Sequence, residues 1–324
     1  MPVFNGSALL ARAICSIQQQ TFEDFELIIL DNQSTDSTPE ICHTFARQDS
    51  RLRYIRDTEY RTTHEAASYL KSLARGKYSV YASDDDIWLS DFLSTLVAIL
   101  DADDTVGMAG SNCQYIDMDG QFLRRPFLKS SEIRRMEKGS FSFWWQFLLK
   151  RNVIPFIFGL YRTDVLHETP EFLAFDETGA DVDNLFVLNI AASVKISISP
   201  KILFGYCLKT RPRPWSEAWD RSLSGRIRYF TSQVKHQLNF NKKILSILKI
   251  SNFSWLEQHI LQLRIIWCFV AQILFKYPAG RMYAWLLLAK HGKMLDQLIM
   301  TERTRSIDLQ SRGKGYLWDS SKRE

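Results

Sequence analysis

Two hydrophobic patterns alternate along residues 1–110. Residues 26–31 (ELIILD) form a short apolar run, typical of a strand that is buried on both faces, and residues 78–82 (YSVYA) are a second candidate strand. Residues 8–20 instead place apolar side chains at helical spacing, and Pro39 suits the first turn of another helix. Strands that alternate with short helices predict an α/β fold, in which a mostly parallel sheet is flanked by helices.

The pattern is less regular between residues 111 and 208. The turn-forming pair Asp119-Gly120 lies between two apolar segments and predicts a small hairpin. Residues 154–161 (IPFIFGLY) and 202–208 are further candidate strands, and residues 185–193 are a candidate helix.

A break at residues 211–215 (RPRPW) separates this part from a mainly helical remainder. We therefore predict an α/β domain over residues 1–210 and a helical extension over residues 211–324. Acidic residues outnumber basic ones up to residue 200 and basic residues dominate afterwards, although the whole chain carries a net charge of +5. The basic extension is either a solvated surface or a site for an anionic partner such as a membrane.

The cysteine and histidine patterns bound the protein class. The five cysteines include no C-x-x-C pair, which argues against a disulfide framework and for a reducing compartment. The histidines lack metal-site spacing, so a histidine zinc site is not expected. The sequence starts without a signal-peptide pattern, and no apolar run reaches the roughly 18 residues that span a bilayer. We expect a cytoplasmic protein.

Acidic residues follow two of the predicted strands. Asp31 ends the first apolar run, and Asp84-Asp85-Asp86 follow residues 78–82. Ligands of open α/β sheets bind beyond the carboxyl ends of the strands. Three consecutive carboxylates repel one another unless they are solvated or neutralised, and Mg²⁺ or Mn²⁺ prefers such oxygen ligands. The alternative is an exposed turn that caps the following helix.

Three segments in this order resemble the family 2 glycosyltransferases, which have the GT-A fold. They are PVFNG at residues 2–6, FEDFELIILDNQSTD at residues 22–36, and GKYSVYASDDDIWLSDFL at residues 76–93. The resemblance covers residues 1–123 strongly and extends to about residue 210. It implies that residues 1–210 are a GT-A-like catalytic domain.

The resemblance also implies a nucleotide site. Phe4 falls where the family stacks an aromatic ring on the base, and Asn5 follows it in the same loop. Asp31 and Asn32 fall at the base-recognising pair, where most relatives have two acids, so Asn32 is a departure. An amide can still recognise the base or ribose by hydrogen bonding. Asp84, the first acid of the aspartate cluster, is also expected to contribute to nucleotide binding.

The family's metal motif and catalytic base are implied in the same way. Asp85 is the expected direct metal ligand and Asp86 a supporting one, whereas Ser83 replaces the usual first acid. The cofactor would be Mn²⁺ or Mg²⁺. Asp183 is the expected base that deprotonates the acceptor, with Asp181 as the second candidate. The alternative is that both carboxylates only cap the helix that follows them.

The implied function is transfer of a sugar, with inversion, from a nucleotide-diphosphate sugar to a saccharide or lipid-linked saccharide. UDP is the default nucleotide, and bacterial surface polysaccharide assembly is the implied pathway. Relatives have a complete strand before PVFNG, so we expect a shortened first strand to lower stability. A catalytically inactive binding or scaffold subunit is one alternative. A nucleotidyltransferase is another, although the Gly-rich loop that it requires is absent from residues 4–8.

Two aromatic and basic regions have alternative explanations. The aromatic residues between 141 and 147 could line an acceptor pocket or pack in the core. The basic helices could lie at the inner face of a membrane or pack on the catalytic domain with their cations outward. No nucleic-acid-binding motif accompanies this charge, so nucleic acid is not an expected partner. The cations of the helices are Arg264, Lys276, Arg281, Lys290 and Lys293.

Overall fold

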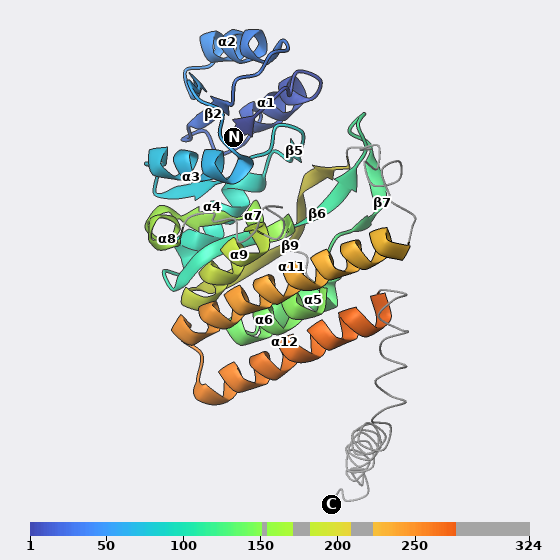
Figure 1. Cartoon of the computed structure of the whole chain (residues 1–324). Helices are drawn as coiled ribbons and strands as arrows, with labels where there is room; N and C mark the ends of the chain where they lie inside the picture. The colour runs from blue at the N-terminus through green and yellow to red at the C-terminus, as the bar shows by residue number, and fades with distance from the viewer. Residues whose placement is uncertain (151–153, 171–181, 209–222, 277–324) are drawn as a thin grey trace, which may run out of the picture.

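The computed structural model describes residues 1–150, 154–170, 182–208 and 223–276. Its N-terminal part is a three-stranded parallel sheet in the order β1-β2-β3, at the opposite end of the molecule from the last described helices (Figure 1). The elements are β1 (Pro2–Val3), α1 (Leu10–Gln18), β2 (Leu27–Asp31), α2 (Thr38–Gln48), β3 (Leu52–Arg56) and α3 (Thr63–Leu73). A capping box between Thr62 and Glu65 starts α3.

A second, mixed sheet follows in the order β4-β8-β6-β9-β5, and β7 pairs with β6. The long strands β6 and β9 are parallel, whereas β4–β8, β5–β9, β6–β8 and β6–β7 are antiparallel. The predicted α/β, GT-A-like class is therefore confirmed, with parallel pairing confined to part of the sheets. The strands are β4 (Tyr78–Val80), β5 (Ile87–Trp88), β6 (Val106–Ile116), β7 (Phe122–Pro126), β8 (Leu160–Arg162) and β9 (Lys195–Cys207).

The predicted hairpin is confirmed and one predicted strand is wrong in part. β6 and β7 pair on either side of Asp119-Gly120, where Gly120 adopts a left-handed φ of 82°. Residues 154–161 instead form the short helix α7 (Ile154–Ile157) and enter β8 only at Leu160. The chain reverses there through a hydrogen bond from Gly159 N–H to the Phe156 carbonyl (2.8 Å). A continuous apolar run does not distinguish a buried helix from a buried strand.

The C-terminal helices pack on the α/β part. α11 (Leu223–Ile250) contacts α9 (Val182–Ser193), and α12 (Trp255–Lys276) contacts α6 (Ser140–Lys150) (Figure 1). Their buried residues share one apolar core with α5 (Ser130–Met136), α6 and α9. No helix of the described residues is long and apolar enough to cross a membrane. The C-terminal members of this core are Phe240, Ile244, Ile247, Leu248, Leu261 and Ile265.

The aromatic run of α6 belongs mainly to this core. Phe143, Trp144 and Phe147 are buried, so the core explanation holds for these three residues. Trp145 is partly exposed, and the guanidinium of Arg264 on α12 lies 4.7 Å from its ring centre. Arg264 thus packs on the domain through a cation–π contact.

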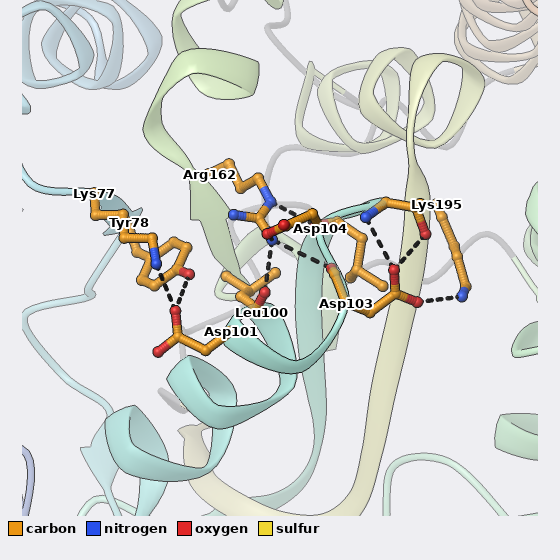
Figure 2. A network of polar contacts seen from close by, with 10 residues as sticks. Lys77, Tyr78, Leu100, Asp101, Asp103, Asp104, Arg162 and Lys195 are labelled. Carbon is orange, nitrogen blue, oxygen red and sulfur yellow. Dashed lines mark hydrogen bonds and ion pairs between the residues drawn. The ribbon is translucent and has the colours of Figure 1, made fainter.

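A polar network connects the end of α4 (Phe92–Ala102) to Tyr78 of β4, Arg162 of β8 and Lys195 of β9 (Figure 2). Arg162 of β8 donates to the carbonyls of Leu100 (2.6 Å) and Val106 (2.8 Å). A guanidinium at a helix C-terminus satisfies carbonyls that lack intrahelical partners. Lys195 of β9 forms an ion pair with Asp103, directly after α4. The short helix α8 (Thr163–Glu168) begins at the residue after β8.

A cavity of about 590 Å³ lies between the two sheets. One wall is formed by Leu27 and Ile28 of β2, and the other by residues 78–82. β1 pairs only with Leu30 and Asp31, while the Met1 amine donates to the Ile28 carbonyl (2.8 Å) and extends this ladder by one residue. The cavity therefore continues the line of β1 along the edge of β2.

Candidate active site

The loop after β1 is fastened to the segment that follows β2. Asn5 adopts a left-handed φ of 51°, which Asn tolerates better than most residues. The hydrogen bonds run from Asn5 N–H to Ser34 Oγ (2.9 Å), from Gly6 N–H to Thr38 Oγ1 (2.9 Å), from Ser7 N–H to Asp36 Oδ2 (3.1 Å) and from Thr35 N–H to Asn5 Oδ1 (2.8 Å). Asn5 thus positions its loop through both backbone and side chain.

Asp36 is the anchor of this junction. Its carboxylate accepts hydrogen bonds from Ser7 N–H and from both the N–H and the hydroxyl of Thr38. Although desolvation raises the pKa of Asp36, the hydrogen bonds from Thr38 and Ser7 together lower it to about 2. The sequence motif included Asp36 without assigning it a role.

Asp31 is fully buried at the end of β2. It accepts hydrogen bonds from Ser34 N–H (2.8 Å) and from the Tyr54 hydroxyl (2.8 Å), and Arg56 lies 3.6 Å away. Desolvation and the hydrogen bond to Asp31 raise the pKa of Tyr54 to about 12. The carboxylate therefore orders the ends of β2 and β3 from within the protein.

Asn32 is engaged with the loop that follows β3. Its Nδ2 donates to the Arg61 carbonyl (2.6 Å), and its Oδ1 accepts from Arg61 N–H (2.8 Å). Arg61 in turn donates to Asp57 (2.6 Å). Because an amide both donates and accepts, Asn32 bonds both the backbone N–H and the backbone carbonyl of Arg61, which an ionised carboxylate cannot do.

This loop presents an aromatic residue beside Phe4. The rings of Phe4 and Tyr60 meet edge to face with their centres 5.8 Å apart. Both are exposed, at 50% and 62%, which is unusual for two neighbouring aromatic side chains. Phe4 was predicted from the sequence, whereas Tyr60 was missed because it lies outside the three motifs.

The acidic loop after β4 directs its three carboxylates to different surroundings. Asp84 lies beside Gly6, where a Cβ would come within 2.5 Å of Asp84 Oδ2. Asp85 is partly exposed and accepts a hydrogen bond from the Ser83 hydroxyl. Asp86 is fully buried and accepts from Cys207 N–H of β9 (2.7 Å). The absence of a side chain at Gly6 thus lets the first acidic residue approach the loop after β1.

Arg12 of α1 connects this acidic loop to the hairpin and to β9. Its guanidinium donates to the carbonyls of Asp85 (2.7 Å) and Met118 (2.6 Å), and it contacts Cys207 Sγ at 3.7 Å. The sequence pattern gave no reason to select Arg12 or Cys207.

The predicted catalytic bases are only partly described. Asp183 is exposed in the first turn of α9, while Asp181 lies outside the described residues. Desolvation and then the negative charges of Asp86 and Asp85 raise the pKa of Tyr206 to about 12, and Asp183 contributes to the same shift. Tyr206 of β9 therefore interacts with charge from both acidic regions.

Two of the three carboxylates are accessible enough to contribute to a divalent metal site. No group of three or more His, Cys, Asp and Glu side chains suited to a metal ion occurs among the residues described. Asp84 and Asp85 are adjacent and not fully buried. Mg²⁺ is usually bound by one or two carboxylates together with substrate phosphates and water, so this donor set is compatible with a divalent ion.

Curated proteins of similar sequence are glycosyltransferases. The chain is 30% identical over 122 residues to glycosyltransferase GlyG of Streptococcus pneumoniae, covering 38% of this chain and 40% of the relative. It is 31% identical over 142 residues to the GalNAc(5)-diNAcBac-PP-undecaprenol beta-1,3-glucosyltransferase of Campylobacter jejuni, covering 42% and 45%. The matches thus span less than half of each relative.

Solved structures of similar fold bind nucleotides. The chain matches residues 1–349 of S. aureus TarS in complex with UDP with a TM-score of 0.58 and 15% identity, covering 85% of this chain and 70% of that TarS fragment. It matches the mannosyltransferase PcManGT of Pyrobaculum calidifontis, in complex with GDP-Man and Mn²⁺, with a TM-score of 0.52 and 16% identity, covering 99% and 86%. At these identities the likeness shows the fold.

The family model for glycosyl transferase family 2 matches residues 1–165. This region contains the loop after β1, the ends of β2 and β3 and the acidic loop after β4. The chain belongs to glycosyl transferase family 2.

Proposed function

We propose that this protein transfers a sugar, with inversion, from a nucleotide-diphosphate sugar to a saccharide or lipid-linked saccharide. UDP is the default nucleotide, and surface polysaccharide assembly is the proposed setting. The TarS structure is a complex with UDP and the PcManGT structure a complex with GDP-Man, and the Campylobacter relative is named after an undecaprenol-linked saccharide. These similarities support a nucleotide-diphosphate sugar as the donor and a lipid-linked saccharide as the acceptor.

The carrying observation is the close approach of Asp84 to Gly6. This approach brings the acidic loop after β4 close to the loop that contains Phe4. One bound nucleotide could therefore contact Phe4 with its base and the acidic loop with its diphosphate. The exposed rings of Phe4 and Tyr60 would contact the base, and the buried Asp31 would support them by ordering the ends of β2 and β3. Asn5 and Asn32 hold the two loops that carry the aromatic pair.

The acidic residues would divide the chemistry among them. We assign Asp85 as the metal ligand, with Asp84 beside the nucleotide and Asp86 as a buried support. Bound Mn²⁺ or Mg²⁺ would supply charge neutralisation for the diphosphate leaving group. Asp183 would accept the proton of the acceptor hydroxyl, a step that typically contributes about 10²–10⁴-fold. Asp181 remains the second candidate for this role.

A thermal-shift screen tests donor binding directly. UDP-sugars and GDP-mannose, each with and without MnCl₂, should raise Tm, because a ligand that binds only the folded state stabilises it. The Asp85→Ala variant should lose the Mn²⁺-dependent part of the shift and all sugar transfer. Its Tm without ligand should stay close to that of wild type. Near-normal turnover by this variant would refute the metal assignment.

An inactive binding or scaffold subunit is the second candidate. The observation in its favour is that both polar atoms of Asn32 are already used by the Arg61 backbone. Hydrolysis of a nucleotide sugar in the absence of acceptor separates the two, because a scaffold would bind without Mn²⁺-dependent release of UDP. A nucleotidyltransferase gains no support from these contacts.

We also propose a cytoplasmic location with peripheral contact at the inner face of the membrane. α12 exposes several large apolar side chains, a composition suited to a membrane interface. Of the predicted basic residues, Arg264 instead packs on Trp145, and Arg281, Lys290 and Lys293 lie outside the described residues. Co-sedimentation with vesicles of phosphatidylglycerol, compared with phosphatidylcholine, tests the contact, and absence of binding to both would remove it. The exposed apolar residues of α12 include Trp255, Leu256, Leu263 and Ile266.

A further inference from the structure

We propose that Arg12 is a positioning residue for the donor diphosphate. It would fix the acidic loop, defined as Asp84–Asp86, against the β6–β7 hairpin turn and the end of β9. This inference rests on the proposed function, because it concerns how the same site is held. Arg12 itself contacts neither donor nor metal in this proposal.

The contacts of Arg12 come from three separate elements. Its Nη2 donates to the Asp85 carbonyl (2.7 Å), and its Nη1 donates to the Met118 carbonyl (2.6 Å). Nη2 also lies 3.7 Å from Cys207 Sγ, and Cys207 Sγ lies 3.7 Å from the Asp117 carbonyl. One rigid guanidinium thus joins the acidic loop, the hairpin turn and β9.

The hairpin turn is shaped to receive this guanidinium. Asp117 closes the turn by accepting hydrogen bonds from the N–H groups of Asp119 (3.0 Å) and Gln121 (2.8 Å). A Cβ on Gly120 would lie 2.9 Å from Ile87 Cδ1 and 3.4 Å from Arg12 Nη1. The turn therefore packs closely on both Arg12 and the residue that follows the acidic loop.

The geometry requires arginine in particular. Arg12 uses two guanidinium nitrogens on two different carbonyls, whereas the single ammonium of lysine cannot reproduce this fork. The contact is to the Asp85 backbone, so it restricts the main chain without involving the Asp85 carboxylate. The adjacent residue is held by a second hydrogen bond, because Asp86 accepts from Cys207 N–H (2.7 Å). Arg12 thus holds the Asp85 carbonyl and Cys207 holds the Asp86 side chain, so two neighbouring residues of the acidic loop are fixed.

The test compares Arg12→Met and Arg12→Lys with Arg47→Met, which removes an exposed arginine from α2. UDP is titrated by tryptophan fluorescence at fixed MnCl₂, and MnCl₂ is titrated at fixed UDP. Loss of a group that orients metal ligands typically costs about 10–100-fold in metal affinity or activity. We expect at least a tenfold rise in the MnCl₂ concentration for half-saturation in Arg12→Met, a smaller rise in Arg12→Lys and none in Arg47→Met.

Thermal unfolding with and without UDP and MnCl₂ separates positioning from a general structural role. Positioning predicts that the ligand-induced rise in Tm shrinks in Arg12→Met more than its ligand-free Tm falls. If Arg12→Met does not fold, the same comparison is made with Arg12→Lys. Wild-type binding of UDP and Mn²⁺ with unchanged half-saturation in the folded Arg12 variants would overturn the role of Arg12 alone. Failure of the wild-type protein to bind UDP or GDP with Mn²⁺ would overturn the proposed function and this inference together.

Discussion

The backbone N–H of Cys207, the last residue of β9, donates a 2.7 Å hydrogen bond to Oδ1 of Asp86 in the acidic loop, 121 residues earlier in the chain. Asp86 is fully buried there, whereas its neighbour Asp85 is partly exposed. Two adjacent carboxylates therefore have different surroundings, one in the protein interior and one partly exposed at the surface.

Asp86→Ala should destabilise the fold more than Asp85→Ala. The first change leaves a buried Cys207 N–H without its acceptor, which costs roughly 1–3 kcal/mol. The second removes a partly exposed carboxylate, so its effect on stability should be smaller. Urea unfolding of both variants measures the difference, with Asp86→Asn as a control that retains an oxygen acceptor. Equal stabilities of the two alanine variants would contradict this division.

Asn32→Asp should destabilise the protein although it introduces the acid that the family resemblance leads one to expect at this position. Oδ1 would still accept from Arg61 N–H, but a carboxylate oxygen would replace the Nδ2 group that donates to the Arg61 carbonyl. Two acceptors would then face each other, at a cost of roughly 1–3 kcal/mol. Thermal unfolding measures the loss, and UDP titration reports whether the Tyr60 loop has moved. A variant as stable as wild type would show that the loop accommodates the acid.

The sequence was sufficient for contacts that are local or carried by a motif. The alternation of strands and helices over residues 1–110, the hairpin at Asp119-Gly120 and the acidic loop after β4 follow from hydrophobic period and turn chemistry. Arg12 could not be predicted as a site residue, because its carbonyl partners lie 73 and 106 residues further along the chain. Tyr60 could not be predicted as a site residue, because its exposed ring suggests a binding role only once its contact with Phe4 is known.

The pairing of the strands could not be predicted either, because it depends on residues that are distant in sequence. The apolar residues of β4 specify burial, but they do not specify an antiparallel partner in β8. Register and partner depend on which edges meet after the chain collapses, and a single sequence does not encode that choice in a short window.

Gly6→Ala should weaken donor binding without unfolding the domain. The new methyl group would lie 2.5 Å from Asp84 Oδ2 and 2.6 Å from Val3 Cγ2, so the Asp84 side chain must move. Displacement of this kind can also cost on the order of a hundredfold in the rate of transfer. UDP titration with MnCl₂ measures binding and an initial-rate assay measures transfer, with Ala8→Ser at the neighbouring exposed position as the control. Unchanged affinity in Gly6→Ala would mean that Asp84 has room to move without loss.

An apolar strand fused ahead of Met1 should enter the cavity between β2 and β4. The Met1 amine already donates to the Ile28 carbonyl, so a preceding segment would continue the ladder along Leu27 and Ile28. About five Val- and Ile-rich residues, close to the usual strand length, should raise Tm relative to a Gly/Ser segment of equal length. Equal Tm values for the two fusions would show that the cavity does not accept a strand.

Acid should abolish the stabilising effect of Asp36. Hydrogen bonds from Thr38 and Ser7 outweigh desolvation and lower the pKa of Asp36 from 3.8 to about 2. Because the folded state holds the carboxylate ionised, its contribution is complete above about pH 4 and disappears as the pH falls through 2. Asp36→Asn should therefore be less stable than wild type near neutral pH, and the two unfolding free energies should converge between pH 4 and pH 2. Asp24→Asn, which changes an exposed carboxylate, should show no such convergence. A gap between Asp36→Asn and wild type that stays constant down to pH 2 would mean that the junction between Ser7 and Thr38 does not depend on the charge of Asp36.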